Sequence, residues 1–348
     1  MSAKRAPFPI GEASVEAGSQ AVIDLPVSKF ANHTPITLPV RVIHGRRDGP
    51  VLFVSGVIHG DEIIGVEIIR RLCRMAALRR LRGTLLCIPI LNVFGFINHS
   101  RYLPDRRDLN RSFPGSPNGS LAAQLAHLFT TEIVAKADAG IDLHSAALNR
   151  VNLPQLRLDF AHERTLELAT AFGVPVIVNS PPRRGSLRLT GQESGVDMMT
   201  YEGGEALRFD EFAVRAGVRG ILRVMKALDM VSARSVADAR TTPALSDASA
   251  WTRAAESGIL RTFKAPGESV AAEDVLGVIA NPYEDIETEV RATLPGLIIG
   301  RTNLPVVNQG DALFNIARVP SASGAERKVD AIETELDGDP IFDEDEII

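Results

Sequence analysis

The stretch Val51-Leu-Phe-Val-Ser-Gly-Val-Ile-His-Gly-Asp-Glu62 joins an apolar run to the start of a helical pattern. Its first eight residues are almost continuously apolar, which is typical of a strand buried on both faces. Between residues 62 and 77 the apolar side chains recur at the spacing of one helical face: Ile63, Val66, Ile69, Leu72 and Cys73. The stretch therefore predicts a buried strand that leads into a helix, with polar side chains at the junction.

The same alternation continues to about residue 230. Strands are predicted at 84–91, 139–143, 175–179 and 196–202, and helices at 120–136, 161–172 and 210–228. Strands that alternate with helices favour a mainly parallel sheet covered on both faces. The predicted fold class is therefore α/β, and in such sheets functional sites gather at the carboxyl ends of the strands.

The composition divides the chain into segments. Residues 1–45 are expected to pack on the core, and residues 46–230 to form the main α/β domain. Residues 231–250 are rich in Ala, Ser, Thr, Asp and Pro, which predicts a linker. Short alternating runs with Ser-Gly and Pro-Gly pairs predict a small all-β unit at 251–318. Residues 319–348 end in four acidic residues and two isoleucines, so we expect a disordered acidic tail there.

Charge and hydropathy exclude several classes of partner. The net charge is −5 and the sequence pI is about 5.9, whereas proteins that neutralise phosphates usually carry a basic excess, so no nucleic acid is expected. The longest apolar runs are too short to span a bilayer, so no membrane association is expected. No secretory signal is visible, and we interpret Cys73 and Cys87 as reduced core thiols of a cytoplasmic protein.

Three side chains form a candidate metal site. His59 and Glu62 lie where the first strand ends, three residues apart and close enough to bind one ion together. His144 directly follows the strand at 139–143 and is expected at the same edge of the sheet. Two imidazoles, one carboxylate and a position left to water form a ligand set that zinc uses for hydrolysis. A His-x-x-Glu pair alone is weak support, but the strand-end placement of both histidines strengthens it.

A long non-periodic loop follows the strand at 84–91. It carries Arg101 and the run Asp108-Leu-Asn-Arg111, and loops of this length within compact domains are usually functional. Asn110 beside Arg111 offers an amide and a planar guanidinium, which together suit a substrate carboxylate.

A carboxylate at another strand end is a candidate general base. Glu202 directly follows the strand-like run Val196–Tyr201 and precedes two glycines that allow close backbone approach. Glu205 is the alternative, and we favour Glu202 because it directly follows the strand. The arginines that come shortly before it suit an acidic-substrate pocket, but we favour exposed loop arginines: Arg183, Arg184 and Arg188.

These motifs resemble the succinylglutamate desuccinylase/aspartoacylase family, which is related to the zinc carboxypeptidases. The resemblance covers most of residues 40–320 and rests on four motifs in the family's order: His59-Gly-Asp-Glu62, Asp108-Leu-Asn-Arg111, Asp142-Leu-His144 and Glu202. It implies a carboxypeptidase-like α/β core. In that core, residues 46–230 form the catalytic domain and bind one zinc ion through His59, Glu62 and His144.

The same resemblance implies roles for the other residues. Glu202 takes the proton of the attacking water and later delivers it to the leaving amine. Arg101 polarises the scissile carbonyl, and Asn110 and Arg111 hold the carboxylate of the amino-acid half. A barrel-like C-terminal domain, similar to biotinyl and lipoyl carriers, is also implied. Its hairpin at 279–288 contains no lysine to carry a cofactor, so we expect the domain to shape the site entrance.

The sequence therefore predicts a zinc-dependent amidohydrolase that cleaves an N-acyl amino acid or a related small carboxylate. A metallocarboxypeptidase acting on short peptides is one alternative, and a non-catalytic small-molecule-binding protein on the same fold is another. The sequence contains no Gly-x-Ser-x-Gly elbow, Walker A loop or GxGxxG fingerprint. No tyrosine motif assigns a catalytic role, and neither the acyl group nor a homo-oligomeric state follows from the residues.

Overall fold

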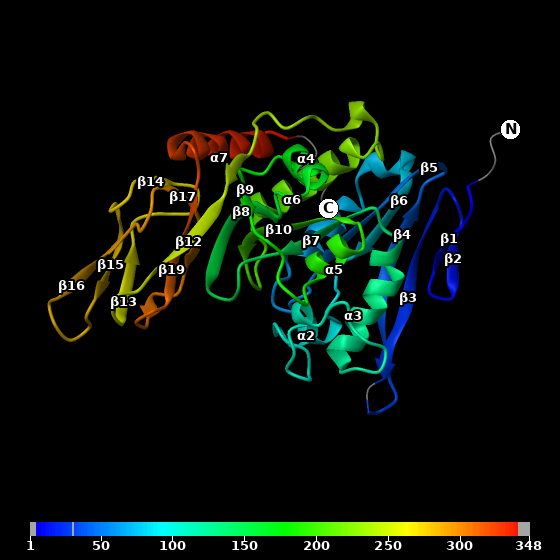
Figure 1. Ribbon diagram of the computed structural model, residues 1–348, viewed down its shortest axis with the longest axis horizontal. Helices are drawn as coiled ribbons and strands as arrows, with labels where there is room; N and C mark the ends of the chain where they lie inside the picture. Colours follow the sequence, from blue (N-terminus) through cyan, green and yellow to red (C-terminus); the bar gives the residue numbers. More distant parts are fainter. Residues whose placement is uncertain (1–4, 30, 340–348) are drawn as a thin grey trace.

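The computed structural model describes residues 5–29 and 31–339, and a large mixed sheet runs through the molecule (Figure 1). Within these residues the sheet has thirteen strands, and its main path runs β12-β19-β17-β8-β10-β7-β5-β6-β4-β3. The strands of its central part are β3 (Ser19–Lys29), β4 (Pro35–His44), β5 (Arg47–Gly56), β6 (Arg82–Ile88), β7 (Ala139–His144), β8 (Arg150–Leu158), β9 (Val176–Asn179) and β10 (Asp197–Glu205).

The centre of this sheet is parallel, as the sequence predicts. Strands β6, β5, β7 and β10 pair in parallel, whereas β4 and β8 join them antiparallel on either side. The register places Ser55 opposite Asp142 and His144 opposite Glu202. The carboxyl ends of β5, β7 and β10 therefore meet at one edge.

Helices cover both faces of the sheet because successive residues of β5 point to opposite sides. Leu52 and Val54 pack in a core with α1 (Ile64–Leu72), α4 (Glu163–Phe172) and α6 (Glu211–Ala227). Phe53 packs in a second core with α2 (Val93–Ile97), α3 (Leu121–Glu132) and α5 (Leu187–Glu193). Figure 1 shows α4 and α6 on one side of the strands and α2 and α3 on the other. The short 3-10 helices are η1 (Ala76–Arg80), η2 (Leu109–Arg111), η3 (Val134–Lys136) and η4 (Ala233–Ser235).

The N-terminal part adds strands to the sheet. β4 pairs with β6, β3 pairs with β4, and β1 (Phe8–Ile10) with β2 (Ala13–Val15) forms a separate ribbon. Phe8, Ile10 and Val15 are buried in the same core as Phe53. Cys73 and Cys87 form no disulfide and their sulfur atoms lie 3.6 Å apart; Cys87 is buried and Cys73 is partly buried.

The C-terminal strands do not confirm the expected barrel-like domain, because they form open sheets. One sheet has the order β16-β15-β13-β18, from β13 (Gly258–Thr262), β15 (Val275–Ala280), β16 (Glu287–Arg291) and β18 (Val306–Val307). The other strands extend the large sheet: β11 (Ala244–Ser246), β12 (Ala248–Arg253), β14 (Ser269–Val270), β17 (Gly296–Thr302) and β19 (Ala312–Arg318). β17 pairs with β8, so this second group bonds to the main sheet instead of closing on itself.

The segment expected to be a disordered tail contains a helix, and this is a correction. α7 (Ala322–Asp337) buries Ala325, Val329, Ile332 and Leu336, which recur at helical spacing along one face. Burial of that stripe stabilises the helix against the sheet and α6. The four acidic residues at 343–346 lie outside the described residues. The expected linker at 231–250 likewise contains η4, β11 and the start of β12.

Candidate metal centre and substrate cavity

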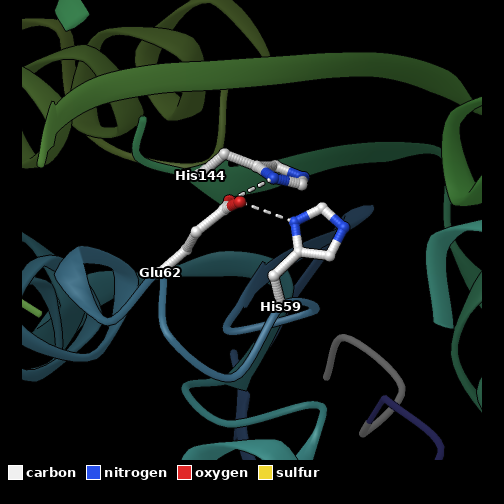
Figure 2. A group of neighbouring side chains, drawn as sticks. All are labelled: His59, Glu62 and His144. Carbon is white, nitrogen blue, oxygen red and sulfur yellow. Dashed lines mark hydrogen bonds and ion pairs between the residues drawn. The ribbon is translucent and has the colours of Figure 1, made fainter. Parts of the chain in front are cut away.

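Two histidines and one glutamate meet at the carboxyl edge of the sheet. His59 and Glu62 come from the loop between β5 and α1, and His144 is the last residue of β7. Nδ1 of each imidazole lies 2.7 Å from one oxygen of the Glu62 carboxylate (Figure 2). One donor atom from each residue lies within 4.8 Å of the others, and all three side chains are buried. The three residues that the sequence selects as metal ligands are thus brought together.

The chain must turn tightly to place this group. β5 ends at Gly56, and Val57 adopts a positive φ of 57°, which redirects the backbone away from the strand. Gly60 packs against the backbone of Gly95, where an added Cβ would lie 1.9 Å from the carbonyl carbon. Only glycine fits where the two backbones approach so closely. Packing therefore requires the glycine of the His-Gly-Asp-Glu sequence, whose two end residues are the candidate metal ligands.

A second set of carboxylates fixes the two imidazoles. Nε2 of His144 lies 2.8 Å from Asp142, whose other oxygen accepts a hydrogen bond from the Ser55 hydroxyl at 2.8 Å. Nε2 of His59 lies 3.2 Å from Asp108. Because both Nε2 atoms are engaged outside the group, both Nδ1 atoms face Glu62, which is the arrangement of histidines prepared to bind a metal ion.

Arg101 connects the metal group to its supporting carboxylate. Its guanidinium donates to Glu62 at 3.2 Å and to Asp108 at 3.0 Å. Burial alone would raise the pKa of Glu62, but His59 and His144 outweigh it, so this pKa lies well below its usual range. Burial would likewise raise the pKa of Asp108, but His59 and Arg101 lower it overall. Both carboxylates are therefore ionised at neutral pH.

Asn110 and Arg111 lie on η2, which Asp108 caps by accepting from the Asn110 amide at 2.8 Å. The Asn110 side-chain oxygen accepts from the backbone amide of Leu187 at 3.0 Å, which holds this turn against the start of α5. The Arg111 side chain is exposed and donates to the carbonyl of Asn110. Both residues line the same cavity as the metal group.

Glu202 also lines this cavity, near the end of β10. It accepts from the Asn152 amide at 3.0 Å, and Nε of Arg157 lies 3.9 Å away. Glu205, the alternative from the sequence, accepts from Asn303 and does not line the cavity. The geometry therefore favours Glu202 as the group that faces a bound substrate.

The cavity measures about 350 Å³, the size expected for a small-molecule site. Its polar lining includes residues that the sequence analysis does not single out: Arg150, Asn152, Arg157, Ser180 and Trp251. Three of them lie on β8, a strand that was not predicted. Asn152 and Arg157 are five residues apart and would face opposite sides of a regular strand. A register shift between β8 and β10 lets both face the cavity.

Arg188 differs from the expectation of an exposed loop arginine. It lies on α5, lines the cavity and is largely buried, with one guanidinium nitrogen lacking a hydrogen-bond partner. Burial and the charge of Arg157 lower its pKa to about 10, so it is still cationic at neutral pH. Arg183 and Arg184 are exposed, as expected, but Arg183 also lines the cavity.

The chain's three tyrosines stay out of the cavity. Tyr201 is fully buried and donates to the carbonyl of Ala213 at 2.6 Å. Tyr102 and Tyr283 are exposed. A larger cavity of about 470 Å³ lies beside α4 and α6, but its cations are paired, Arg223 with Glu335 and Lys226 with Asp238.

A histidine–glutamate–histidine group at the carboxyl edge of a helix-covered mixed sheet is a donor set that can hold a metal ion. The chain belongs to the succinylglutamate desuccinylase/aspartoacylase family, because the model of that family's catalytic domain matches residues 48–228, more than half of the chain. The family expected from the sequence motifs is thereby confirmed.

Known relatives cover more than four fifths of the chain. An N-alpha-acetyl-L-2,4-diaminobutyric acid deacetylase from Halomonas elongata is 28% identical over 319 residues, which cover 83% of this chain and 88% of the relative. A succinylglutamate desuccinylase/aspartoacylase structure from Rhodobacter sphaeroides has a TM-score of 0.76 at 24% identity, covering 86% of this chain and 96% of that one. The product-bound ectoine utilization protein EutE from Ruegeria pomeroyi has a TM-score of 0.75 at 22% identity, covering 86% and 94%. These two structures share the fold.

No helix among residues 5–29 and 31–339 combines the length and the apolar character that a membrane crossing requires.

Proposed function

We propose that this protein is a zinc-dependent amidohydrolase that removes the acyl group from an N-acyl amino acid. The observation that carries the proposal is that one small cavity holds three convergent metal ligands and a separate glutamate, Glu202. Its family membership and its deacetylase relative support the same reaction class.

The donor set fits zinc. Imidazole nitrogen and carboxylate oxygen both suit this ion, and a zinc ion held by three protein ligands would keep a position for water. A zinc ion held by His59, Glu62 and His144 would supply a Lewis acid and lower the pKa of water toward neutrality. We propose one such ion per chain.

The surrounding side chains supply the remaining functions. Glu202 accepts a proton from the attacking water and returns it to the leaving amine, and its hydrogen bond from Asn152 fixes the carboxylate for this task. Arg101 places positive charge beside Glu62, where it stabilises the oxyanion that forms on the scissile carbonyl.

Asn110 and Arg111 bind the carboxylate of the amino-acid half. Asn110 accepts from Leu187, so its side-chain NH₂ group is left to donate to a substrate. The exposed guanidinium of Arg111 adds two parallel donors that match a carboxylate. The substrate of the Halomonas relative, an acetylated amino acid, belongs to the class that this arrangement suits.

Two alternatives predict different substrates. A metallocarboxypeptidase needs space for a peptide, whereas the cavity of about 350 Å³ has Trp251 from the C-terminal strands in its wall. A non-catalytic binding protein predicts that one catalytic part is missing, whereas every part has a candidate in this cavity. A cytoplasmic location stays a prediction from the sequence.

The test is an amine-release assay with the zinc-loaded protein on N-acetyl amino acids and on dipeptides that share the same C-terminal residue. We expect hydrolysis of the N-acetyl compounds with a kcat/KM at least tenfold above that of the dipeptides. Faster hydrolysis of the dipeptides would favour the peptidase, and no hydrolysis of either set with zinc bound would favour the binding protein.

A further inference from the structure

The two cysteines of the chain meet at a place that the proposed reaction does not use. Cys73 caps the end of α1, and Cys87 lies in β6. Their sulfur atoms lie 3.6 Å apart, and neither residue lines the cavity of the metal group. Since they are 14 residues apart and come from different elements, tertiary packing and not a local turn brings the two thiols together.

The contact follows from the packing of α1 on the sheet. Cys87 pairs with Val54 in the parallel β5–β6 register, and both side chains belong to the core that α1 covers. The side chain of Cys73 packs against the same core. Cys87 is fully buried, whereas Cys73 is partly exposed at the end of the helix. A small oxidant in solution therefore reaches Cys73 first.

The surroundings also make Cys73 the more reactive thiol. The hydrogen bond with Cys87 lowers the pKa of the Cys73 thiol, and the positive charge of Arg41 lowers it further, whereas burial acts in the opposite direction. Arg41 pairs with Cys87 in the antiparallel β4–β6 register. The pKa of Cys87 is raised by the shared hydrogen bond and by burial. Because the thiolate is the nucleophile, the pair has one attacking sulfur and one resolving sulfur.

We propose that Cys73 and Cys87 form a reversible oxidation site for peroxide, and that the resulting disulfide joins the end of α1 to β6. The Cys73 thiolate attacks hydrogen peroxide: an S–O bond forms, the O–O bond breaks, and the departing hydroxide takes up a proton to become water. Cys87 then attacks the sulfenic sulfur: the S–S bond forms, the S–O bond breaks, and hydroxide leaves as water with the proton of Cys87. The two thiols lose two electrons and two protons, and the peroxide is reduced to two waters.

The bond forms without moving the metal group. At the other end of α1, an added Cβ on Gly65 would lie 2.9 Å from the Cα of Gly56, so this end of the helix is packed closely on β5. The helix ends at Cys73, and the approach of the two sulfur atoms from 3.6 Å to about 2.05 Å is taken up there, at the end remote from Glu62. The disulfide closes a loop of about 15 residues in the unfolded chain, which stabilises the folded state.

The experiment treats the zinc-loaded protein with a small excess of hydrogen peroxide. Intact mass, tryptic peptides without reduction and the thermal unfolding midpoint are measured before and after treatment. We expect a mass loss of about 2 Da and a link between the peptides 72–74 and 83–101. The midpoint should rise by about 3–6 °C, and dithiothreitol should reverse all three changes.

Variants separate the roles of the two thiols. Cys87→Ser removes the resolving sulfur, so peroxide should leave a sulfenic acid on Cys73 that dimedone traps, with a gain in mass instead of a loss. Cys73→Ser leaves only the buried thiol, which should stay unmodified. Arg41→Gln should slow disulfide formation several-fold. The matched control is Arg47→Gln, because Arg47 is an exposed arginine at the start of β5, and its rate should equal that of the wild type.

The opposite results overturn the proposal. Peroxide that oxidises methionines and leaves both cysteine peptides unlinked excludes the site, and so does a disulfide between two chains. A linked protein with an unchanged or lowered midpoint contradicts the role of the bond in joining α1 to β6. If Cys87→Ser alters the circular dichroism spectrum, the peptide link in the wild type decides the question alone. None of these readouts requires hydrolysis, so the result is independent of the proposed function.

Discussion

Asp142 lies 2.8 Å from Nε2 of His144, and this contact leaves Nδ1 of the same ring facing Glu62. Burial would lower the pKa of His144, but Asp142 and Glu62 raise it well above its ordinary value. The alternation of side chains along β7 sets the relationship, because Asp142 and His144 lie two residues apart on this strand and point to the same side. Ser55 on the neighbouring strand then holds Asp142 in place.

Asp142→Asn should weaken metal binding about 10–100-fold, because the amide no longer fixes the tautomer and basicity of His144. The measurement is zinc affinity by competition with a chromogenic chelator. Ser55→Ala removes the next contact outward and should have a smaller effect. Equal zinc affinity in the wild type and Asp142→Asn would show that the contact is structural only.

Glu202→Gln should retain zinc and lose about 10²–10⁴-fold in kcat, because the amide keeps the hydrogen-bonded shape of the carboxylate but cannot accept a proton. Metal content and steady-state hydrolysis are measured on the same preparation. The matched variant is Glu205→Gln, whose side chain bonds to Asn303 outside the cavity. A larger loss of kcat in Glu205→Gln than in Glu202→Gln would assign the proton-shuttle role to Glu205 instead.

Arg101→Gln should lower kcat about 10²–10³-fold by removing a preorganised positive charge next to Glu62. Arg107→Gln provides the comparison, because Arg107 is an exposed arginine of the same loop that does not line the cavity. The assay is the initial rate at saturating substrate. A loss seen only in KM would instead place Arg101 in ground-state binding.

Glu335→Ala should destabilise the protein by about 3–5 kcal/mol, because it leaves Arg223 buried without its partner. The measurement is urea unfolding followed by circular dichroism. Asp247→Asn removes one member of an exposed pair with Arg318 and should not shift the unfolding midpoint. An unchanged midpoint in Glu335→Ala would show that α7 contributes little to the stability of the core.

Local patterns predict the centre of the fold well. The apolar run at 51–58 and the helical spacing that follows appear as β5 and α1, and the strand at 139–143 as β7. β8 is not predicted because Pro154 interrupts the strand pattern. In addition, its polar residues change from one face to the other at the register shift, which breaks the alternation expected of a strand. α7 is not predicted because most of its residues are polar or charged and its apolar stripe is narrow. Packing on residues distant in sequence stabilises this helix.

The candidate site likewise contains some residues that the sequence predicts and others that it does not. The metal ligands and Glu202 follow predicted strands, so adjacency of strand ends in a parallel sheet is enough to suggest that they meet. Arg150 and Trp251 are a hundred residues apart in sequence and carry no motif. They meet because β17 pairs with β8 and β12 joins the same sheet through β19, a connection that spacing alone does not predict.

The most direct test of the central claim is the zinc content of the purified protein by elemental analysis, with His144→Ala alongside. We expect about one zinc per chain in the wild type, the stoichiometry of a three-ligand site, and its loss in His144→Ala with the fold retained by circular dichroism. A wild type that takes up no zinc when the ion is supplied, or a His144→Ala variant that binds zinc equally well, would contradict the assignment of His59, Glu62 and His144 as a metal centre.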